Sequence, residues 1–276
     1  MRSQSLGDES ASGRISGVSI ALLLDTTFRT TELWTQALRA AMPEERLVLT
    51  TELSDDSSRA AVDVALVRGV DPGDLSRFPN LTLIQCLWAG ADKLLGDPSV
   101  PTDVPLARMV DPAMADQMAA TALAHTLDIC LHHHDYREKQ LRAVWAPRHA
   151  KPMSTKTVAI LGFGSLGKRC AEYISTTGAT VIGARSSRTT REDHTPWNTT
   201  SSITEAVARA DVIINLLPLT NDTVGVLNET LFASCRPAAA LVNLGRGAHL
   251  VENDLLTALE SGQLNRAVLD VVFHGV

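Results

Sequence analysis

Residues 157–188 read TVAILGFGSLGKRCAEYISTTGATVIGARSSR, and this stretch decides the fold of the chain around it. Thr157–Leu161 and Thr180–Ala184 are short apolar runs of the kind that form buried strands. Three apolar residues recur at helical spacing between them: Leu166, Cys170 and Ile174. The stretch therefore predicts a strand, a tight turn, a helix and a second strand.

The turn after the first strand carries the pattern G-x-G-x-x-G at Gly162, Gly164 and Gly167. In a dinucleotide-binding turn the first glycine makes the turn, the second lets a pyrophosphate approach the backbone, and the third lets the helix pack on the strand. The start of the following helix then faces the phosphates with backbone N–H groups that have no partner within the helix. An ordinary turn before a surface helix is the alternative, but the flanking strands favour a dinucleotide site.

The residues after the second strand indicate which dinucleotide binds. NAD-specific turns place an Asp or Glu there for the ribose hydroxyls, whereas this chain has Arg185, Ser186, Ser187 and Arg188. Cationic and hydroxyl side chains suit a 2′-phosphate. We therefore predict NADP(H) in preference to NAD(H), with a solvated basic turn as the alternative.

Composition limits the classes of function. The 276 residues are 45% hydrophobic and 20% charged, as in globular proteins, and the net charge of −6 argues against a nucleic-acid partner. Residues 1–17 contain no apolar run and predict a flexible leader, and no stretch is long and apolar enough for a membrane span. The four cysteines are widely spaced, which predicts buried free thiols and a cytoplasmic protein without membrane partners.

Residues 18–110 predict a smaller parallel α/β domain, which we expect to be flavodoxin-like and to bind substrate. A helix is expected over Thr31–Ala41. Five short apolar runs are the candidate strands: Val18–Leu24, Arg46–Thr50, Val62–Val67, Leu81–Cys86 and Leu106–Val110.

The segment LWAGADKL follows the fourth of these strands. Ala89, Gly90 and Ala91 are small residues between a strand end and a short helix, where free backbone N–H groups can bind a carboxylate. Trp88 is placed to form a wall of such a pocket. An ordinary strand-to-helix turn with a packed tryptophan is the alternative.

A long helix from Ala113 to Gln140 is predicted to join this domain to a second one, residues 111–276. The triplet His132, His133 and His134 lies within it. Three consecutive helical residues point in three directions, so we predict no metal site.

The second half of the chain continues to alternate between strands and helices. Helices are expected from Ser202, from Asn228 and over Glu252–Ser261, the last closed by Gly262. Three further strands are expected at Val212–Leu217, Ala239–Asn243 and Ala267–Val272. This pattern predicts a Rossmann-type doubly wound parallel sheet, in which ligands gather beyond the carboxyl ends of the strands.

Two charged residues lie at such strand ends. Arg246 stands between Gly245 and Gly247, where its guanidinium can bind a carboxylate bidentately and polarise a neighbouring carbonyl. Asp270 lies in the apolar run AVLDVV, where an unpaired carboxylate would be costly, so it either faces the cofactor pocket or caps a turn. For Arg246 the alternative is a solvated loop residue.

The ordered motifs GFGSLG, LLPLTNDTVGVLN, LVNLGRGAHLVENDLLTALESGQL and AVLDV resemble those of the D-isomer-specific 2-hydroxyacid dehydrogenases. WAGAD and MADQM are most similar to the glyoxylate/hydroxypyruvate reductase branch. The resemblance runs from about Val18 to Val272. It implies hydride transfer from NADPH to the keto carbon of a small 2-oxoacid, and a homodimer formed through the cofactor domain.

The resemblance also assigns roles to residues. It implies that Arg246 is catalytic and that Ala89, Gly90 and Ala91, beside Trp88, bind the substrate carboxylate. The implied cofactor residues at the pyrophosphate are those of the glycine turn: Gly162, Gly164, Ser165, Leu166 and Gly167. Those at the adenosine ribose are Arg185, Ser186 and Arg188. Those on the nicotinamide side are Pro218, Thr223, Leu244 and Asp270.

The family's proton donor is a histidine in a Pro-His dipeptide, supported by a glutamate in a D-V-F-x-x-E-P motif. The chain contains no Pro-His and ends VVFHGV, so Gly275 or Val276 stands where the glutamate is expected. We therefore expect a Rossmann domain that lacks its C-terminal elements. Two hypotheses follow: a reductase by ancestry with weak or no activity in this chain, or a non-catalytic NADP-binding protein with a regulatory or association role.

Overall fold

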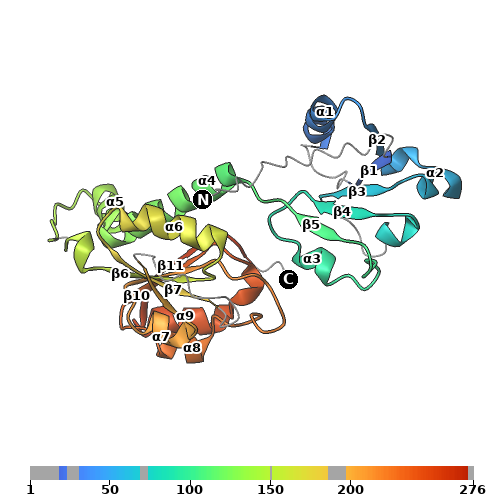
Figure 1. Cartoon of the computed structure of the whole chain (residues 1–276). Helices are drawn as coiled ribbons and strands as arrows, with labels where there is room; N and C mark the ends of the chain where they lie inside the picture. The colour runs from blue at the N-terminus through green and yellow to red at the C-terminus, as the bar shows by residue number, and fades with distance from the viewer. Residues whose placement is uncertain (1–18, 24–30, 69–73, 150, 186–196, 273–276) are drawn as a thin grey trace, which may run out of the picture. The chain divides into compact units, whose positions relative to one another are not determined.

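The computed structural model describes residues 19–23, 31–68, 74–149, 151–185 and 197–272 (Figure 1). The chain divides into two compact units, Met1–Val110 and Asp111–Val276. The expected leader, residues 1–17, lies outside the described residues. Among those that are described, no helix combines the length and apolar character needed to cross a membrane.

The first unit contains a parallel sheet with the strand order β2-β1-β3-β4-β5. This 2-1-3-4-5 order is that of flavodoxin-like folds, and it confirms the predicted class. Its strands are β1 (Ser19–Leu23), β2 (Arg46–Leu49), β3 (Val64–Val67), β4 (Leu83–Cys86) and β5 (Leu106–Arg108). Its helices are α1 (Thr31–Ala41), α2 (Asp56–Ala60) and α3 (Asp92–Leu95), with 3₁₀ turns at Thr50–Glu52 and Asp74–Arg77.

The second unit contains a parallel sheet with the order β11-β10-β9-β6-β7-β8. Numbered within the unit, this is the 3-2-1-4-5-6 order of the Rossmann fold, with the switch point between β6 and β9. Its strands are β6 (Thr157–Leu161), β7 (Thr180–Ala184), β8 (Asn198–Thr200), β9 (Val212–Asn215), β10 (Ala239–Asn243) and β11 (Leu264–Leu269). The predicted doubly wound parallel sheet is therefore confirmed.

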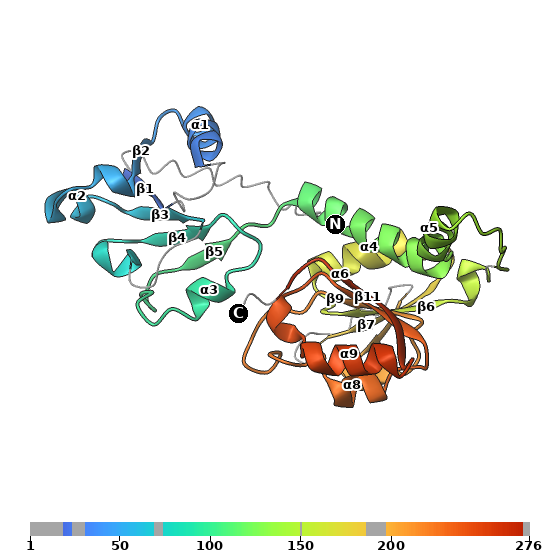
Figure 2. The same cartoon turned by 180° about the vertical axis from the view of Figure 1, so that it is seen from behind.

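Helices cover both faces of this sheet (Figures 1 and 2). One face carries α4 (Pro112–Cys130) and α6 (Ser165–Ser175), whose buried residues pack with Val158 and Ile160. The other face carries α7 (Ile203–Val207), α8 (Glu229–Ala233) and α9 (Glu252–Glu260). The described 3₁₀ turns of this unit are Met153–Thr155 and Gly247–His249. Because both faces are covered, the central strands are apolar throughout and the polar groups that matter lie at the strand ends.

Several predicted strands are one or two residues shorter in the structure, and two predicted elements differ by three residues or more. The helix expected from Ala113 to Gln140 ends at Cys130, and α5 (His133–Leu141) begins after His132, whose φ is +59°. Apolar residues drive α4 onto the sheet, whereas α5 carries charges such as Asp135, which pairs with Arg148 and with Arg266 at 2.9 Å. Strand β11 begins three residues before the predicted Ala267, directly after the Gly262 turn.

All four cysteines are buried and free, as predicted. Burial raises the pKa of the Cys170 thiol to about 12 and that of Cys235 to about 11. Thiols with such raised pKa values hold their protons at neutral pH and act as small apolar core residues.

Candidate active site

The carboxyl ends of five strands lie in one row across the second sheet. In the strand register Ala184 pairs with Leu161, Leu161 with Asn215, Asn215 with Asn243, and Asn243 with Leu269. The row spans four strand spacings of about 4.8 Å each. The glycine turn, the loops after β9 and β10, and the end of β11 therefore share one edge, which we call the carboxyl edge.

The glycine turn has the geometry that the sequence predicts. Gly162 has a φ of +96°, and a Cβ there would lie 2.5 Å from the carbonyl oxygen of Leu216. A Cβ on Gly167 would lie 2.3 Å from the carbonyl oxygen of Gly162. Both positions therefore need glycine for the fold itself: Gly162 for the turn, and Gly167 for the close approach of α6.

Gly164 differs from the other two because a Cβ there would meet no protein atom within 4 Å. It is the residue before α6, and no side chain caps that end of the helix. The first N–H groups of a helix have no intrahelical partner, and Ser165 and Leu166 supply two of them. Open space and directed N–H groups are what a pyrophosphate requires, so the turn fits a dinucleotide.

Of the residues predicted to bind the 2′-phosphate, Arg185 directly follows β7. The backbone N–H of Arg185 donates to the carbonyl oxygen of Thr200 at 3.1 Å, and its side chain is half-buried. Ser186 and Arg188 lie outside the described residues.

The loop after β10 holds Arg246 between two glycines, with a half-buried side chain. Its Nη1 donates to the carbonyl oxygen of Gly245 at 2.9 Å. In the neighbouring loop after β9, the Thr223 hydroxyl donates to the carbonyl oxygen of Pro218 at 2.7 Å. Two of the residues assigned to the nicotinamide side are thus bonded to each other beside the Arg246 loop.

Three fully buried polar side chains lie beneath these loops, and the sequence reasoning missed them as a group: Asn215, Asn243 and His249. Asn215 Nδ2 donates to Asn243 Oδ1 and to His249 Nδ1, each at 2.9 Å. Asn at the last position of two adjacent apolar strands was the available signal, because buried polar side chains need partners.

Asp270 directly follows β11 and is exposed. Its backbone N–H donates to the carbonyl oxygen of Asn243 at 3.1 Å, which continues the sheet pairing by one residue. The carboxylate lies beyond the apolar strand, so the burial cost expected from the sequence does not arise. Its position at the carboxyl edge agrees with the predicted one.

In the first unit, Trp88, Ala89, Gly90 and Ala91 follow β4 as expected. The carbonyl oxygen of Trp88 accepts from the N–H of Met109 at 3.1 Å, and that of Gly90 accepts from the Cys86 thiol at 3.8 Å. The carbonyl oxygen of Ala91 accepts the Leu95 N–H of α3 at 2.9 Å. The loop carbonyls are thus bonded within the unit.

The sequence reasoning also missed Arg68 in this loop region. It directly follows β3 and is 5% exposed, and its guanidinium carbon lies 5.0 Å from the centroid of the Trp88 ring. An arginine at the end of the apolar run VALV was the available signal. The pair gives the Trp88 loop a cationic neighbour.

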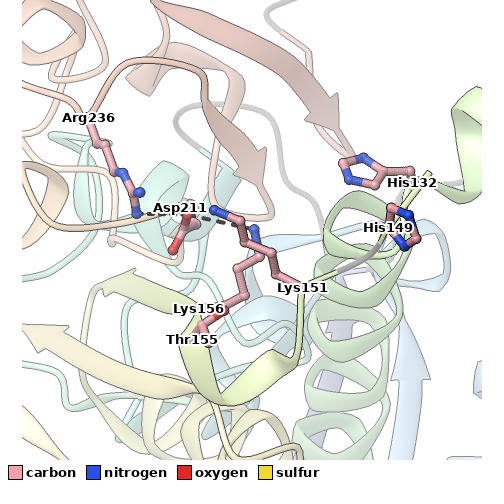
Figure 3. A pocket seen from close by; sticks show the side chains of 7 residues that line it. All are labelled: His132, His149, Lys151, Thr155, Lys156, Asp211 and Arg236. Atoms are coloured by element: carbon pink, nitrogen blue, oxygen red, sulfur yellow. Dashed lines mark hydrogen bonds and ion pairs between the residues drawn. The ribbon is translucent and has the colours of Figure 1, made fainter.

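A separate pocket of about 230 Å³ opens at the amino ends of the strands of the second sheet (Figure 3). Seven residues line it: His132, His149, Lys151, Thr155, Lys156, Asp211 and Arg236. Figure 3 shows Asp211 between Arg236, at 2.9 Å, and Lys156, at 3.9 Å. The glycine turn and Arg246 are at the other ends of the strands, so this pocket is not the predicted cofactor site.

The break between α4 and α5 divides the histidine triplet. His132 lies before α5, and His133 and His134 lie inside α5. Within the described ranges, no group of three or more His, Cys, Asp or Glu residues is placed to hold a metal ion.

Comparison with known proteins agrees with this geometry. Residues 120–275 match the family model of the D-isomer specific 2-hydroxyacid dehydrogenase, NAD binding domain. The chain is 35% identical over 255 residues to glyoxylate/hydroxypyruvate reductase A of Serratia proteamaculans, covering 88% of this chain and 78% of that protein.

Two solved structures are similar over most of the chain. One is an NADPH-dependent glyoxylate/hydroxypyruvate reductase of Sinorhizobium meliloti in complex with NADP and sulfate, with a TM-score of 0.83 and 29% identity. The other is a D-isomer specific 2-hydroxyacid dehydrogenase of Xanthobacter autotrophicus Py2 with NADPH and MES, with a TM-score of 0.83 and 27% identity. Each similarity covers 94% of this chain and 82% of the other.

Proposed function

The chain belongs to the D-isomer specific 2-hydroxyacid dehydrogenase family, and from this we propose that it is an NADP(H)-dependent reductase of small 2-oxoacids. Glyoxylate and hydroxypyruvate are the proposed substrates, and glycolate and glycerate the products. The observation that carries the proposal is the row of strand ends, which brings the open glycine turn and Arg246 to the same edge of one sheet.

The glycine turn binds the cofactor in this proposal. The N–H groups at the start of α6 donate hydrogen bonds to the pyrophosphate where Gly164 leaves room for it, and Gly162 and Gly167 keep the helix close to the strand. The bound NADPH supplies the hydride. Pro218, Thr223, Leu244 and Asp270 are the residues that we assign to the nicotinamide side.

The preference for NADP(H) is assigned to Arg185, with Ser186 and Arg188. A guanidinium at the end of β7 recognises a 2′-phosphate, which NAD lacks. The related structures from Sinorhizobium and Xanthobacter contain NADP and NADPH, which supports the assignment. We expect NADPH to raise the melting temperature more than NADH at equal concentration, and equal stabilisation would contradict the preference.

Arg246 acts on the substrate. Its planar guanidinium binds the carboxylate of a 2-oxoacid bidentately and withdraws electron density from the adjacent carbonyl oxygen, which makes the keto carbon a better hydride acceptor. We assign residues 18–110 as the substrate domain and residues 111–276 as the cofactor domain. In the substrate domain the loop from Trp88 to Ala91 is assigned to the substrate carboxylate.

The reduced oxygen must also receive a proton. The family resemblance assigns that proton to a histidine in a Pro-His dipeptide, which these 276 residues do not contain. A missing acid/base group typically lowers the rate by about 10²–10⁴-fold. Binding and turnover are therefore tested separately.

The decisive experiment measures NADPH oxidation with glyoxylate and with hydroxypyruvate for the chain and for Arg246→Ala. Turnover that the substitution abolishes supports the reductase. NADPH binding without any turnover supports instead the alternative, a non-catalytic NADP-binding protein. A chain that does not bind NADPH would contradict both.

We also propose that the protein is a cytoplasmic homodimer formed through the cofactor unit. Beyond α4, three large apolar residues are strongly exposed: Leu141 at 88%, Val144 at 51% and Trp145 at 92%. Arg266 of β11 pairs with Asp128 of α4 and with Asp135 of α5, so the exposed apolar residues follow helices that are anchored to the sheet. Such an exposed apolar group is typical of a subunit contact.

Sedimentation tests the proposed dimer. The wild type should sediment as a dimer that Trp145→Ser weakens, and a monomeric wild type would contradict the proposal.

A further inference from the structure

Each polar side-chain atom of Asn215, Asn243 and His249 beneath the carboxyl edge has at least one hydrogen-bond partner. The two Nδ2 protons of Asn215 go to Asn243 and His249, and its Oδ1 accepts the Leu217 N–H at 3.2 Å. Asn243 Oδ1 also accepts the Gly245 N–H at 3.2 Å. Buried polar side chains that are satisfied in this way favour one arrangement over all others, because each broken bond leaves a buried group unpaired.

Both backbone polar groups of Arg246 are bound by this group of side chains. Its N–H donates to His249 Nδ1 at 3.3 Å, and its carbonyl oxygen accepts from Asn243 Nδ2 at 3.2 Å. The start of the Arg246 side chain is therefore placed by two buried side chains and not by the loop alone.

The same histidine reaches the neighbouring loop. His249 Nε2 lies 3.2 Å from the carbonyl oxygen of Pro218, the atom that also accepts the Thr223 hydroxyl. Because Nδ1 accepts two N–H groups, the proton of the neutral ring is on Nε2 and is donated to Pro218. One imidazole thus links the Arg246 loop at one nitrogen and the Pro218 loop at the other.

Gly245 independently shows how closely the loop packs on this group. A Cβ there would lie 2.8 Å from Asn215 Nδ2 and 3.1 Å from His249 Nδ1. The glycine before Arg246 is needed because the loop backbone rests directly on the amide and the imidazole.

We propose that His249 is a positioning residue for the 2-oxoacid: it sets Arg246 relative to the Pro218 loop, through Nδ1 on one side and Nε2–H on the other. The inference rests on the proposed function, since it concerns the carboxylate-binding arginine of that site. His249 is fully buried and acts through Arg246, so it does not itself touch substrate in this assignment.

The test replaces each nitrogen separately and reads ligand binding, which needs no proton donor. In His249→Asn the amide oxygen stands near the position of Nδ1, and in His249→Gln the amide end stands near that of Nε2. Oxalate serves as a planar analogue of a 2-oxoacid, and its affinity for the NADPH-bound protein is measured by calorimetry. Thr126→Val, at another fully buried polar residue of the same unit, is the stability control.

We expect His249→Gln to bind oxalate at least tenfold more weakly than wild type, because the acceptor for the Arg246 N–H is lost. His249→Asn keeps that acceptor and loses the contact to Pro218, so it should bind oxalate about threefold more weakly, while NADPH affinity changes little in either variant. Equal loss in both variants, or loss in Thr126→Val as well, would show a merely structural role and overturn the inference. Arg246→Ala separates this failure from that of the proposed function, because retained oxalate binding there would contradict the function itself.

A second measurement needs no variant. Nitrogen NMR of wild type at neutral pH should show His249 with its proton on Nε2 and an unprotonated Nδ1. The opposite tautomer could not accept the Arg246 N–H, and it would overturn the proposal even if every His249 variant failed to fold.

Discussion

The two edges of the six-stranded sheet use different chemistry to hold their loops. At the carboxyl edge, the loops rest on neutral buried side chains, Asn215, Asn243 and His249. At the amino edge, Asp211 accepts the Thr157 N–H at 2.9 Å and pairs with Arg236 and Lys156. One edge is organised by amides and an imidazole, the other by ion pairs.

The difference shows how an anion site can be built on a parallel sheet. The side chains that hold the Arg246 backbone are amides and an imidazole, so this support itself adds no carboxylate that would compete for the guanidinium. At the amino edge, Asp211 lies between Arg236 and Lys156 and engages both cations itself. The charged pocket at the amino edge is therefore the structural one, and the neutral carboxyl edge is the one proposed for binding.

The largest expected effect separates folding from binding within the glycine turn. Gly162→Ala and Gly167→Ala place a Cβ within 2.5 Å of backbone, so each should lower the free energy of unfolding by about 3 kcal/mol or more. Urea denaturation measures the loss. Near-normal stability of either variant would contradict the close approach.

Gly164→Ala is the matched control, because its Cβ meets no protein atom within 4 Å. Its stability should stay within about 0.5 kcal/mol of wild type, as for other substitutions without a structural clash. NADPH affinity should fall at least tenfold, or by about 1.4 kcal/mol, if the space there belongs to the pyrophosphate. Unchanged affinity would place the phosphate elsewhere.

The two arginines at opposite edges give the next comparison. Arg246→Ala should weaken oxalate binding to the NADPH complex by about 100-fold, equivalent to about 2.7 kcal/mol, because a bidentate charged contact is lost. Arg236→Ala should leave that affinity unchanged and cost under about 1 kcal/mol of stability, since its side chain is 51% exposed. Equal effects on oxalate would remove the distinction between the edges.

The sequence predicted the strands of this sheet well because their apolar runs are continuous and end at clear turn signals. β6, β7 and β10 have the predicted bounds, and Asn228 caps α8 as expected by accepting the Leu231 N–H at 3.1 Å. The glycine turn was predictable because Gly162 and Gly167 each meet a local steric need.

What the sequence reasoning missed depends on contacts between distant residues. Asn215 and His249 are 34 positions apart, and the pairing of β9 with β10 brings Asn215 beside the histidine that lies beneath Arg246. The break between α4 and α5 likewise depends on Arg148 and Arg266 pairing with Asp135. Such tertiary contacts leave no periodic pattern in the chain.

A smaller effect is expected from Asp211 at the amino edge. Asp211→Ala should lower the free energy of unfolding by about 2 kcal/mol, because it leaves the Thr157 N–H without its acceptor. Asp211→Asn keeps an acceptor and should cost about half as much. Denaturation curves and NADPH titration test this together, and a loss of NADPH affinity at unchanged stability would give the amino edge a role in binding.

The last comparison has no effect at neutral pH: it is a loss of stability at alkaline pH that distinguishes the Cys170 thiol in α6 from the Cys235 thiol at the amino edge. Burial raises the pKa of Cys170 in α6 to about 12 and that of Cys235, next to Arg236, to about 11, against an unfolded value of 9.0. Above pH 9.0 the unfolded chain has lost protons that the folded chain keeps, so stability is complete below that pH and falls as pH rises. Each thiol contributes at most about 1.4 kcal/mol per pH unit. In Cys235→Ala the free energy of unfolding should therefore fall less steeply with pH only up to about pH 11, and in Cys170→Ala up to about pH 12. Identical curves of unfolding free energy against pH for the two variants would show that the two thiols are buried alike.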